Sequence, residues 1–227
     1  LIQPTSAIPY RREITWSVFD EKANRVANML LGRGIRKGQK VAILLMNCLE
    51  WLPIYFGILK AGAIAVPLNF RYTSDEIDYC LKLADVDVLF FGPEFIVRVE
   101  AIVPKISQQM LLFFVGDTCP SFAEDYHRAT ANCSSMAPKV LIDDEDEAAM
   151  MEAIHHATTH DDVFLCIPPL YHTGAKMHWF GSLFTGSKAV LLKGNSPQAI
   201  FQAVSSERCS IVWLLVPWCQ DILAALD

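Results

Sequence analysis

The sequence predicts an α/β protein in which βαβ units surround mostly parallel sheets. Short runs of consecutive apolar residues, such as Val41–Met46 and Val88–Phe91, are typical of strands buried on both faces of a sheet. Segments with apolar residues at helical spacing separate these runs, as in residues 17–31. Because strands that alternate with helices of about 10–15 residues build parallel sheets, this order predicts βαβ units along the chain.

Helix starts in the first half are marked by pairs of capping residues. Thr73 and Glu76 have the spacing of a capping box, in which each side chain accepts a bond from the other residue's backbone N–H group. Asn47 and Glu50 have the same spacing and predict a second capped helix, which ends near Gly62. Strands of this half are expected at residues 14–16, 41–46, 63–67, 88–91 and 111–115.

The middle of the chain interrupts the alternation. Residues 119–137 are rich in Ser, Thr and Ala and predict a loop, and a subdomain seam is expected near 119–147. The acidic run at 143–147 is expected to be a solvated helix start. Ser196 and Pro197 then predict an N-cap and a first helical residue. Helices are expected over 174–185, 197–208 and from 217 onward, and strands at 163–167, 189–192 and 211–215.

Composition argues against several classes of protein. Apolar residues make up 52% of the 227 residues and charged residues 19%, which suits a packed core rather than a disordered chain. No apolar run approaches the roughly 20 residues of a membrane-spanning helix. The net charge is −6 and no Lys/Arg-rich run occurs, so a nucleic acid partner is not expected.

The seven cysteines are scattered and form no Cys-x-x-Cys pair, so a zinc ribbon is not expected. Several lie in apolar runs and are interpreted as small buried hydrophobic residues. No basic start followed by an apolar run marks a signal peptide. We therefore expect a reduced, cytoplasmic protein.

Three segments carry the functional information. Residues 14–30 run from Ile-Thr-Trp-Ser through a helical pattern, and residues 34–71 include the run Lys-Ala-Gly-Ala-Ile-Ala-Val-Pro-Leu-Asn. Residues 161–174 end in Pro-Pro-Leu-Tyr-His-Thr-Gly, between a buried strand and a helix. Ligands in open α/β sheets gather just outside the carboxyl ends of strands, so the last segment is the candidate site.

These segments resemble the large N-terminal domain of the AMP-binding acyl-CoA synthetases. Luciferases and the adenylation domains of peptide synthetases belong to the same adenylate-forming superfamily. The resemblance covers nearly the whole chain, in order, and implies an ATP-dependent, AMP-forming carboxylate–CoA ligase of the kind used in fatty acid metabolism. In such a ligase a carboxylic acid reacts with Mg²⁺-bound ATP to give an acyl-adenylate, and the acyl group then passes to the thiol of coenzyme A.

The resemblance also assigns roles to residues of the 161–174 segment and the helix after it. His172 matches a histidine beside the acyl carboxylate and the α-phosphate, and is the expected catalytic residue; on position alone, it could instead cap the following helix. Tyr171, Thr173, Gly174 and His178 are the expected substrate-binding residues. If His178 faces the acyl pocket rather than solvent, a polar or aromatic acid is favoured over a long alkyl chain.

The phosphate-binding loop of this family, Thr-Ser-Gly-Thr-Thr-Gly-x-Pro-Lys, does not occur in the sequence. It is expected shortly after Asp146–Ala148, where the chain instead runs through Met150 and Met151. We therefore expect a missing segment between residues 150 and 151. The C-terminal lid is absent as well, so no cofactor-binding residue is assigned, and the 227-residue chain alone is expected to be inactive.

Alternatives remain at this point. An amino-acid adenylation domain or a luciferase-like enzyme belongs to the same superfamily, and a non-catalytic α/β binding or scaffold protein would lack the phosphate loop altogether. His156 and His160 have the i, i+4 spacing of a metal pair, with His155 beside them. No third ligand stands at motif spacing, so no metal site is predicted.

Overall fold

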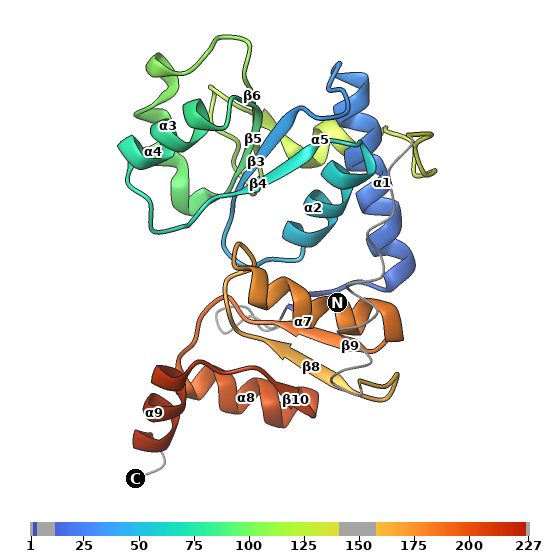
Figure 1. Ribbon diagram of the computed structural model, residues 1–227, viewed down its shortest axis with the longest axis vertical. Coiled ribbons are helices and arrows are strands. Elements are labelled where there is room, and N and C mark those ends of the chain that lie inside the picture. The colour runs from blue at the N-terminus through green and yellow to red at the C-terminus, as the bar shows by residue number, and fades with distance from the viewer. Residues whose placement is uncertain (1, 4–11, 141–157, 226–227) are drawn as a thin grey trace. The chain divides into compact units, whose positions relative to one another are not determined.

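The computed structural model describes residues 2–3, 12–140 and 158–225 of the chain (Figure 1). It divides into a first unit of Leu1–Trp16, Asn47–Leu49 and Asp143–Asp227, and a second unit of Ser17–Met46 and Glu50–Ile142. The predictions for the acidic run at 143–147, for the junction of Met150 and Met151, and for His155 and His156 lie outside the described residues.

The second unit is built on a parallel five-stranded sheet with the order β4-β3-β5-β6-β7. Four of the strands lie where continuous apolar runs predicted them, because a strand covered on both faces has no polar face to show. The strands are β3 (Lys40–Leu44), β4 (Ile64–Pro67), β5 (Val86–Phe91), β6 (Leu111–Phe114) and β7 (Glu124–Asp125).

Helices cover both faces of this sheet. Ala42 and Leu44 of β3 pack with the core residues of α3 and α4, because alternate side chains of a strand share one face. On β5, Phe90 stacks on Phe113 at 5.2 Å and meets Tyr126 of α5 at 6.1 Å between ring centroids. The helices are α1 (Trp16–Gly32), α2 (Trp51–Lys60), α3 (Ser74–Leu83), α4 (Ile96–Glu100) and α5 (Tyr126–Ala131), with short 3₁₀ turns at Pro93–Phe95 and Val103–Lys105.

The capping predictions had opposite outcomes. Thr73 and Glu76 form the predicted capping box at the start of α3. The predicted pair of Asn47 and Glu50 is wrong, because α2 begins at Trp51 and its N-cap residue Glu50 makes no side-chain capping bond. The Asn47 side chain bonds instead to backbone groups more than 100 residues further along the chain.

The predicted loop at residues 119–137 is also wrong in part, because it contains β7 and α5. Asp125 is the N-cap of α5, and its carboxylate accepts a bond from Arg128 N at 2.7 Å. An aspartate three residues before that donor is a readable helix start. The polar composition of the surrounding residues concealed it.

The first unit carries a five-stranded sheet with the order β10-β8-β9-β1-β2, which is parallel except for the antiparallel β1–β2 pair. The strand predicted at residues 14–16 is wrong: the strand is at Arg12–Glu13, and Trp16 already begins α1. The strands are β1 (Ile2–Gln3), β2 (Arg12–Glu13), β8 (Val163–Cys166), β9 (Lys188–Leu191) and β10 (Ile211–Val212).

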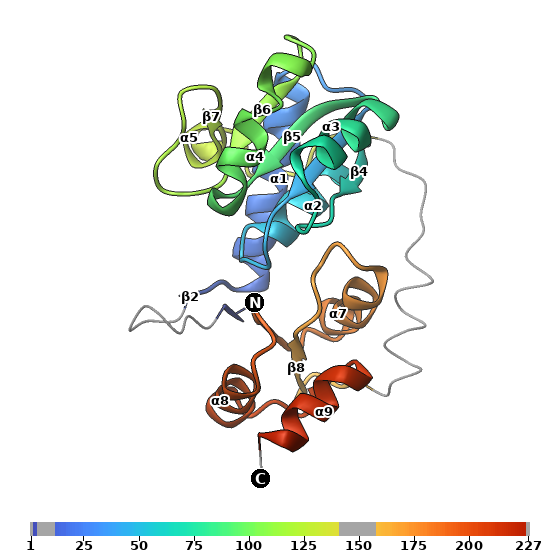
Figure 2. The ribbon, with the colours of Figure 1, turned by 90° about the vertical axis from the view of Figure 1, so that its left-hand side faces the viewer.

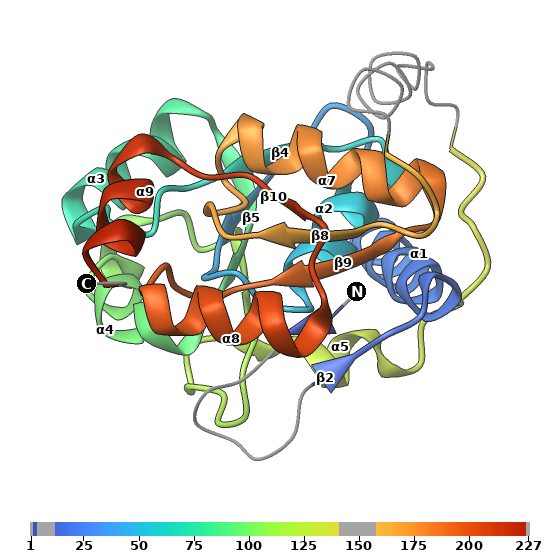
Figure 3. The same cartoon turned by 90° about the horizontal axis from the view of Figure 1, so that it is seen from below.

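Three helices cover the sheet of the first unit: α7 (Thr173–Thr185), α8 (Pro197–Glu207) and α9 (Val216–Ala224). Figure 3 shows α7 on one side of β8 and β9 and α8 on the other. Figure 2 shows α8 and α9 side by side. Leu165 and Val190 pack against Ile200 and Ala203 of α8. Within the described ranges, no helix is long and apolar enough to cross a membrane.

Candidate functional site

His172 lies in the turn between β8 and α7, at the carboxyl edge of the parallel sheet. Its backbone N–H donates to Pro169 O at 3.0 Å, which closes the turn. His172 occupies the N-cap position of α7 with extended backbone, φ −80° and ψ 139°, but its side chain makes no capping bond. The exposed ring lies 4.4 Å from the ring of Tyr171. The imidazole of His172 therefore does not act as a helix cap.

The amino end of α7 gives this turn a favourable electrostatic environment for an anion. The first N–H groups of a helix have no partner within the helix, and they carry a partial positive charge. Since the His172 side chain does not cap them, the first turn at Thr173 and Gly174 is not blocked by its own N-cap residue. One turn later, burial lowers the pKa of Lys176 below its ordinary value.

Asn47 holds the turn from the other side. Its Nδ2 donates to Pro168 O and to Leu192 O, each at 3.0 Å, and its Oδ1 accepts a bond from Leu170 N at 2.9 Å. These bonds use both donors of the amide and one acceptor position. A single buried side chain thus connects the segment after β8 with the end of β9.

A cavity of about 140 Å³ lies beside α7 in the same unit. His178 lines it, with ring centroids 5.5 Å from Trp213 and 6.4 Å from Phe164. His178 therefore lies at the wall of this hollow, and its contact with the acyl group stays a prediction. The lining residues are Thr158, Phe164, His178, Gly181, Ser182, Ile211, Val212 and Trp213.

Two small residues shape the α7 side of this region. A Cβ at Gly174 would lie 3.6 Å from the Trp213 ring, an ordinary contact distance, so the indole lies close to the first turn of α7. Ser182 is fully buried, and its Oγ has no hydrogen-bond partner in the described part of the chain. A buried polar atom without a hydrogen-bond partner destabilises the fold.

The structure thus brings together some of the residues assigned from the sequence and not others. His178 lines the cavity and Gly174 approaches Trp213, but Gly174, Tyr171, His172 and Thr173 are not among the described residues that line it. Sequence reasoning missed Asn47, Phe164 and Trp213 as site residues. The polar Asn47 directly after an apolar strand was the one available signal.

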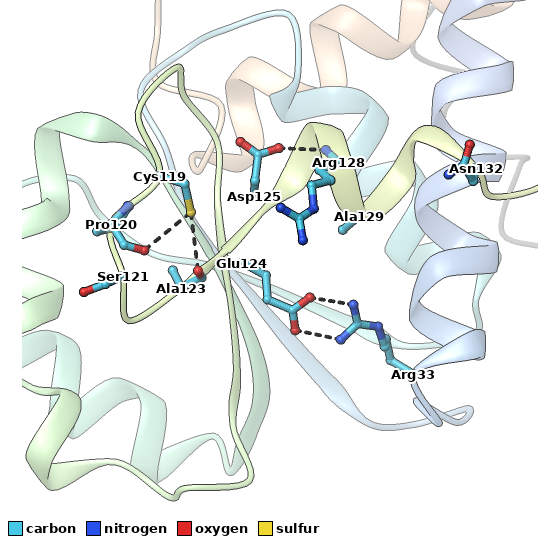
Figure 4. A pocket seen from close by; sticks show the side chains of 10 residues that line it. All are labelled: Arg33, Cys119, Pro120, Ser121, Ala123, Glu124, Asp125, Arg128, Ala129 and Asn132. Atoms are coloured by element: carbon cyan, nitrogen blue, oxygen red, sulfur yellow. Dashed lines mark hydrogen bonds and ion pairs between the residues drawn. The ribbon is translucent and has the colours of Figure 1, made fainter.

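Another cavity, of about 570 Å³, lies in the second unit (Figure 4). The Arg33 guanidinium forms a two-pronged ion pair with Glu124 at 2.6 and 2.5 Å, and this contact raises the pKa of Arg33 and lowers that of Glu124. Asp125 is used as a helix cap. These charged groups bond to one another or to the start of a helix, so we assign no catalytic or binding role to this cavity. Its lining residues are Arg33, Cys119, Pro120, Ser121, Ala123, Glu124, Asp125, Arg128, Ala129 and Asn132.

The described residues do not fit a metal site. No group of three or more His, Cys, Asp or Glu side chains converges among them. His160 lies 3.1 Å from Asp161 through its Nδ1, and both side chains are exposed. We therefore derive no step through Mg²⁺ from these residues.

Comparisons with known proteins identify a family and a shared fold. The model of the AMP-binding enzyme family matches residues 4–151. A medium/long-chain-fatty-acid–CoA/3-oxocholest-4-en-26-oate–CoA ligase of Mycolicibacterium smegmatis is 25% identical over 95% of the chain. The chain spans 48% of that relative, about half its length.

Solved structures share the fold. A long-chain-fatty-acid-CoA ligase from Archaeoglobus fulgidus matches with a TM-score of 0.86 and 15% identity, over 99% of this chain and 50% of the other. The anthranilate CoA ligase AuaEII, in complex with anthranoyl-AMP, matches with a TM-score of 0.84 and 21% identity, over 93% and 46%. At these identities the likeness shows the fold alone.

Proposed function

The chain belongs to the AMP-binding enzyme family, and from this membership we propose that it forms part of an ATP-dependent, AMP-forming carboxylate–CoA ligase. The observation that carries the proposal is the placement of His172. Its exposed imidazole stands at the carboxyl edge of a parallel sheet and at the uncapped amino end of α7. Both features favour an anionic group there.

The proposed reaction has two steps. A carboxylate oxygen forms a bond to the α-phosphorus of ATP, and the bond to the bridging oxygen breaks so that pyrophosphate leaves. The thiolate of coenzyme A then bonds to the acyl carbon, and AMP leaves. In the first step two anions must meet, so catalysis consists mainly of positioning and charge stabilisation. We assign to His172 the orientation of the attacking carboxylate, assisted by the partial positive charge of α7.

The acyl group is proposed to enter the cavity beside α7. Its volume is about 140 Å³. The aromatic rings of Phe164, His178 and Trp213 suit a small aromatic or polar acid better than a long alkyl chain. One structural neighbour is named for anthranilate and one relative for fatty acids, so both acid classes belong in the test.

We propose further that the complete protein carries a phosphate-binding loop between residues 150 and 151. The alignment with the mycobacterial ligase spans 268 residues, more than the 227 of this chain, so that relative contains stretches without a counterpart here. The coding sequence of the complete protein decides the matter. Uninterrupted coding from Met150 to Met151 would favour the non-catalytic scaffold alternative.

The activity is tested by exchange of labelled pyrophosphate into ATP, using the complete protein and a panel of aromatic, polar, short-chain and long-chain acids. Exchange with at least one acid is expected. Absence of exchange with every acid, on folded protein, would refute the ligase assignment.

The role of His172 is tested by comparing the two half-reactions in His172→Ala. Adenylation should fall in kcat and kcat/KM together, while thioester formation from supplied acyl-adenylate is retained. His127→Ala is the matched control, because His127 is exposed and lies 5.0 Å from the neighbouring Tyr126 ring, yet belongs to the second unit. Equal loss of both half-reactions in His172→Ala would show a structural role instead.

A further inference from the structure

We propose that Asn47 is a positioning residue for adenylation: it fixes the turn that presents His172. The inference rests on the proposed function, because it assigns Asn47 a role in the step attributed to His172. Capping logic placed this residue at a helix start, which the structure contradicts, and the candidate motif does not include it.

The first support is the completeness of the Asn47 contacts. The residue is 6% exposed, and its amide bonds to Pro168, Leu170 and Leu192 at 2.9–3.0 Å. Residue 192 also continues the pairing of β9 with β8, since Leu192 N donates to Cys166 O at 3.0 Å. Asn47 therefore ties the turn after β8 to Leu192, the residue that follows β9 at the end of the sheet.

The second support is where these bonds fall in the turn. Asn47 binds the residues on both sides of Pro169, and the carbonyl of Pro169 accepts the N–H bond of His172. Movement of residues 168–170 would therefore carry the His172 backbone with it. Misplacement of a reacting group by about 1 Å costs roughly 10²-fold in rate.

The third support is that local structure does not explain an asparagine here. Asn47 caps no helix, and the N-cap position of α2 is held by Glu50. A shorter or apolar side chain would leave two carbonyls and one N–H group without their partner in a buried place. Only an amide side chain combines two N–H donors with an oxygen acceptor, as these three bonds require.

The experiment uses the complete protein and compares Asn47→Ala with Asn24→Ala. Asn24 is a matched control: it is 3% exposed, its Nδ2 donates to Ser135 O at 2.9 Å, and its Oδ1 accepts from Lys60 Nζ at 2.7 Å. Asn24 belongs to the second unit, whereas Asn47 and the His172 turn belong to the first. Both variants lose a buried amide, so both should lose stability.

The decisive readout is the split between half-reactions. Asn47→Ala is expected to lower the adenylation kcat by about 10²-fold while sparing thioester formation from supplied acyl-adenylate, and Asn24→Ala is expected to lower neither selectively. In a His172→Ala background, Asn47→Ala should cause little further loss of adenylation, because residues that act through one another are not additive. Asn47→Ser, which retains one hydroxyl, serves if Asn47→Ala does not fold.

The outcomes separate the two proposals. If the wild-type protein shows no exchange, the proposed function itself fails. If exchange is present but His172→Ala is not selective for adenylation, the role of His172 fails, and the positioning role of Asn47 fails with it. If His172→Ala is selective but the Asn47 variants behave like Asn24→Ala, or add fully to His172→Ala, then the positioning role of Asn47 is wrong and the ligase assignment stands.

Discussion

Gly57 of α2 lies directly against Val26 of α1: a Cβ built on the glycine would come 2.5 Å from the Val26 Cβ and 2.8 Å from Ala23 O. Real Cβ atoms do not approach other atoms this closely. The glycine stands in the interior of α2, where helical propensity disfavours it by about 1 kcal/mol relative to alanine. Close packing of two helices in the second unit therefore outweighs local preference.

We predict that Gly57→Ala destabilises the protein by about 1–3 kcal/mol, because overpacking exceeds the gain in propensity. Gly32→Ala is the control, since a Cβ there meets nothing within 4 Å, and it should be neutral or slightly stabilising. Urea unfolding of both variants measures the difference. Equal stability of the two would contradict the packing found between α1 and α2.

The ion pair of Lys188 and Glu207 ties β9 to the end of α8. Lys188 Nζ lies 2.7 Å from Glu207 Oε2, and Glu207 is 7% exposed. Glu207→Gln should cost roughly 1.5–3 kcal/mol, the range for hydrogen bonds to charged groups, with the lower end expected because Lys188 is one-third exposed. The exposed pair of Lys105 and Asp75 provides the control, and Lys105→Gln should be nearly neutral. Thermal or urea unfolding of the two variants, in low and high salt, measures the two changes in stability.

The capping box of α3 should give stability a pH dependence. Hydrogen bonds from Thr73 N and Oγ1, at 2.8 and 2.9 Å, lower the pKa of Glu76 below its ordinary 4.5. This stabilisation is present above the pKa of the unfolded chain and is lost as pH falls through the lowered folded value. The stability difference between wild type and Glu76→Gln should therefore shrink on acidification. If this stability difference stayed constant with pH, the Glu76 carboxylate would not be stabilised by the capping box as described.

Cys166 is predicted to be chemically inert in the folded protein. Complete burial raises the pKa of its thiol from 9.0 to about 12, so it carries almost no thiolate near neutral pH. The contribution of this thiol to stability is present below pH 9 and falls as pH rises toward 12. Alkylation followed by mass spectrometry should modify the partly exposed Cys219 first and Cys166 only after unfolding. Early labelling of Cys166 would show that the β8 core opens readily.

Local pattern was enough for much of the framework. The apolar runs located β3, β5, β6, β8 and β9, because strands covered by helices on both faces must be continuously apolar. The caps at Thr73 and Ser196 were legible because a cap is an interaction between residues three apart. Local pattern failed at Asn47, where the same spacing occurred without the cap.

In the candidate site, too, the features set by local sequence were predicted and those set by distant contacts were not. His172 could be proposed from the sequence because it follows a buried strand within a recognisable run, and its place between β8 and α7 is confirmed. The partners of that site were not found. Asn47 bonds to residues 121, 123 and 145 positions away, and Trp213 meets His178 across the end of a sheet.

The sequence alone therefore determined the alternation of strands and helices, two of the helix caps and the turn that carries His172, since each depends on neighbours within a few residues. The tertiary structure decided that Asn47 clamps this turn, that His178 faces an aromatic cavity and that Gly57 must remain a glycine. Those outcomes depend on which distant segments meet. The chain folds so as to satisfy buried polar groups and close packing among such segments, and one-dimensional periodicity carries no record of their pairing.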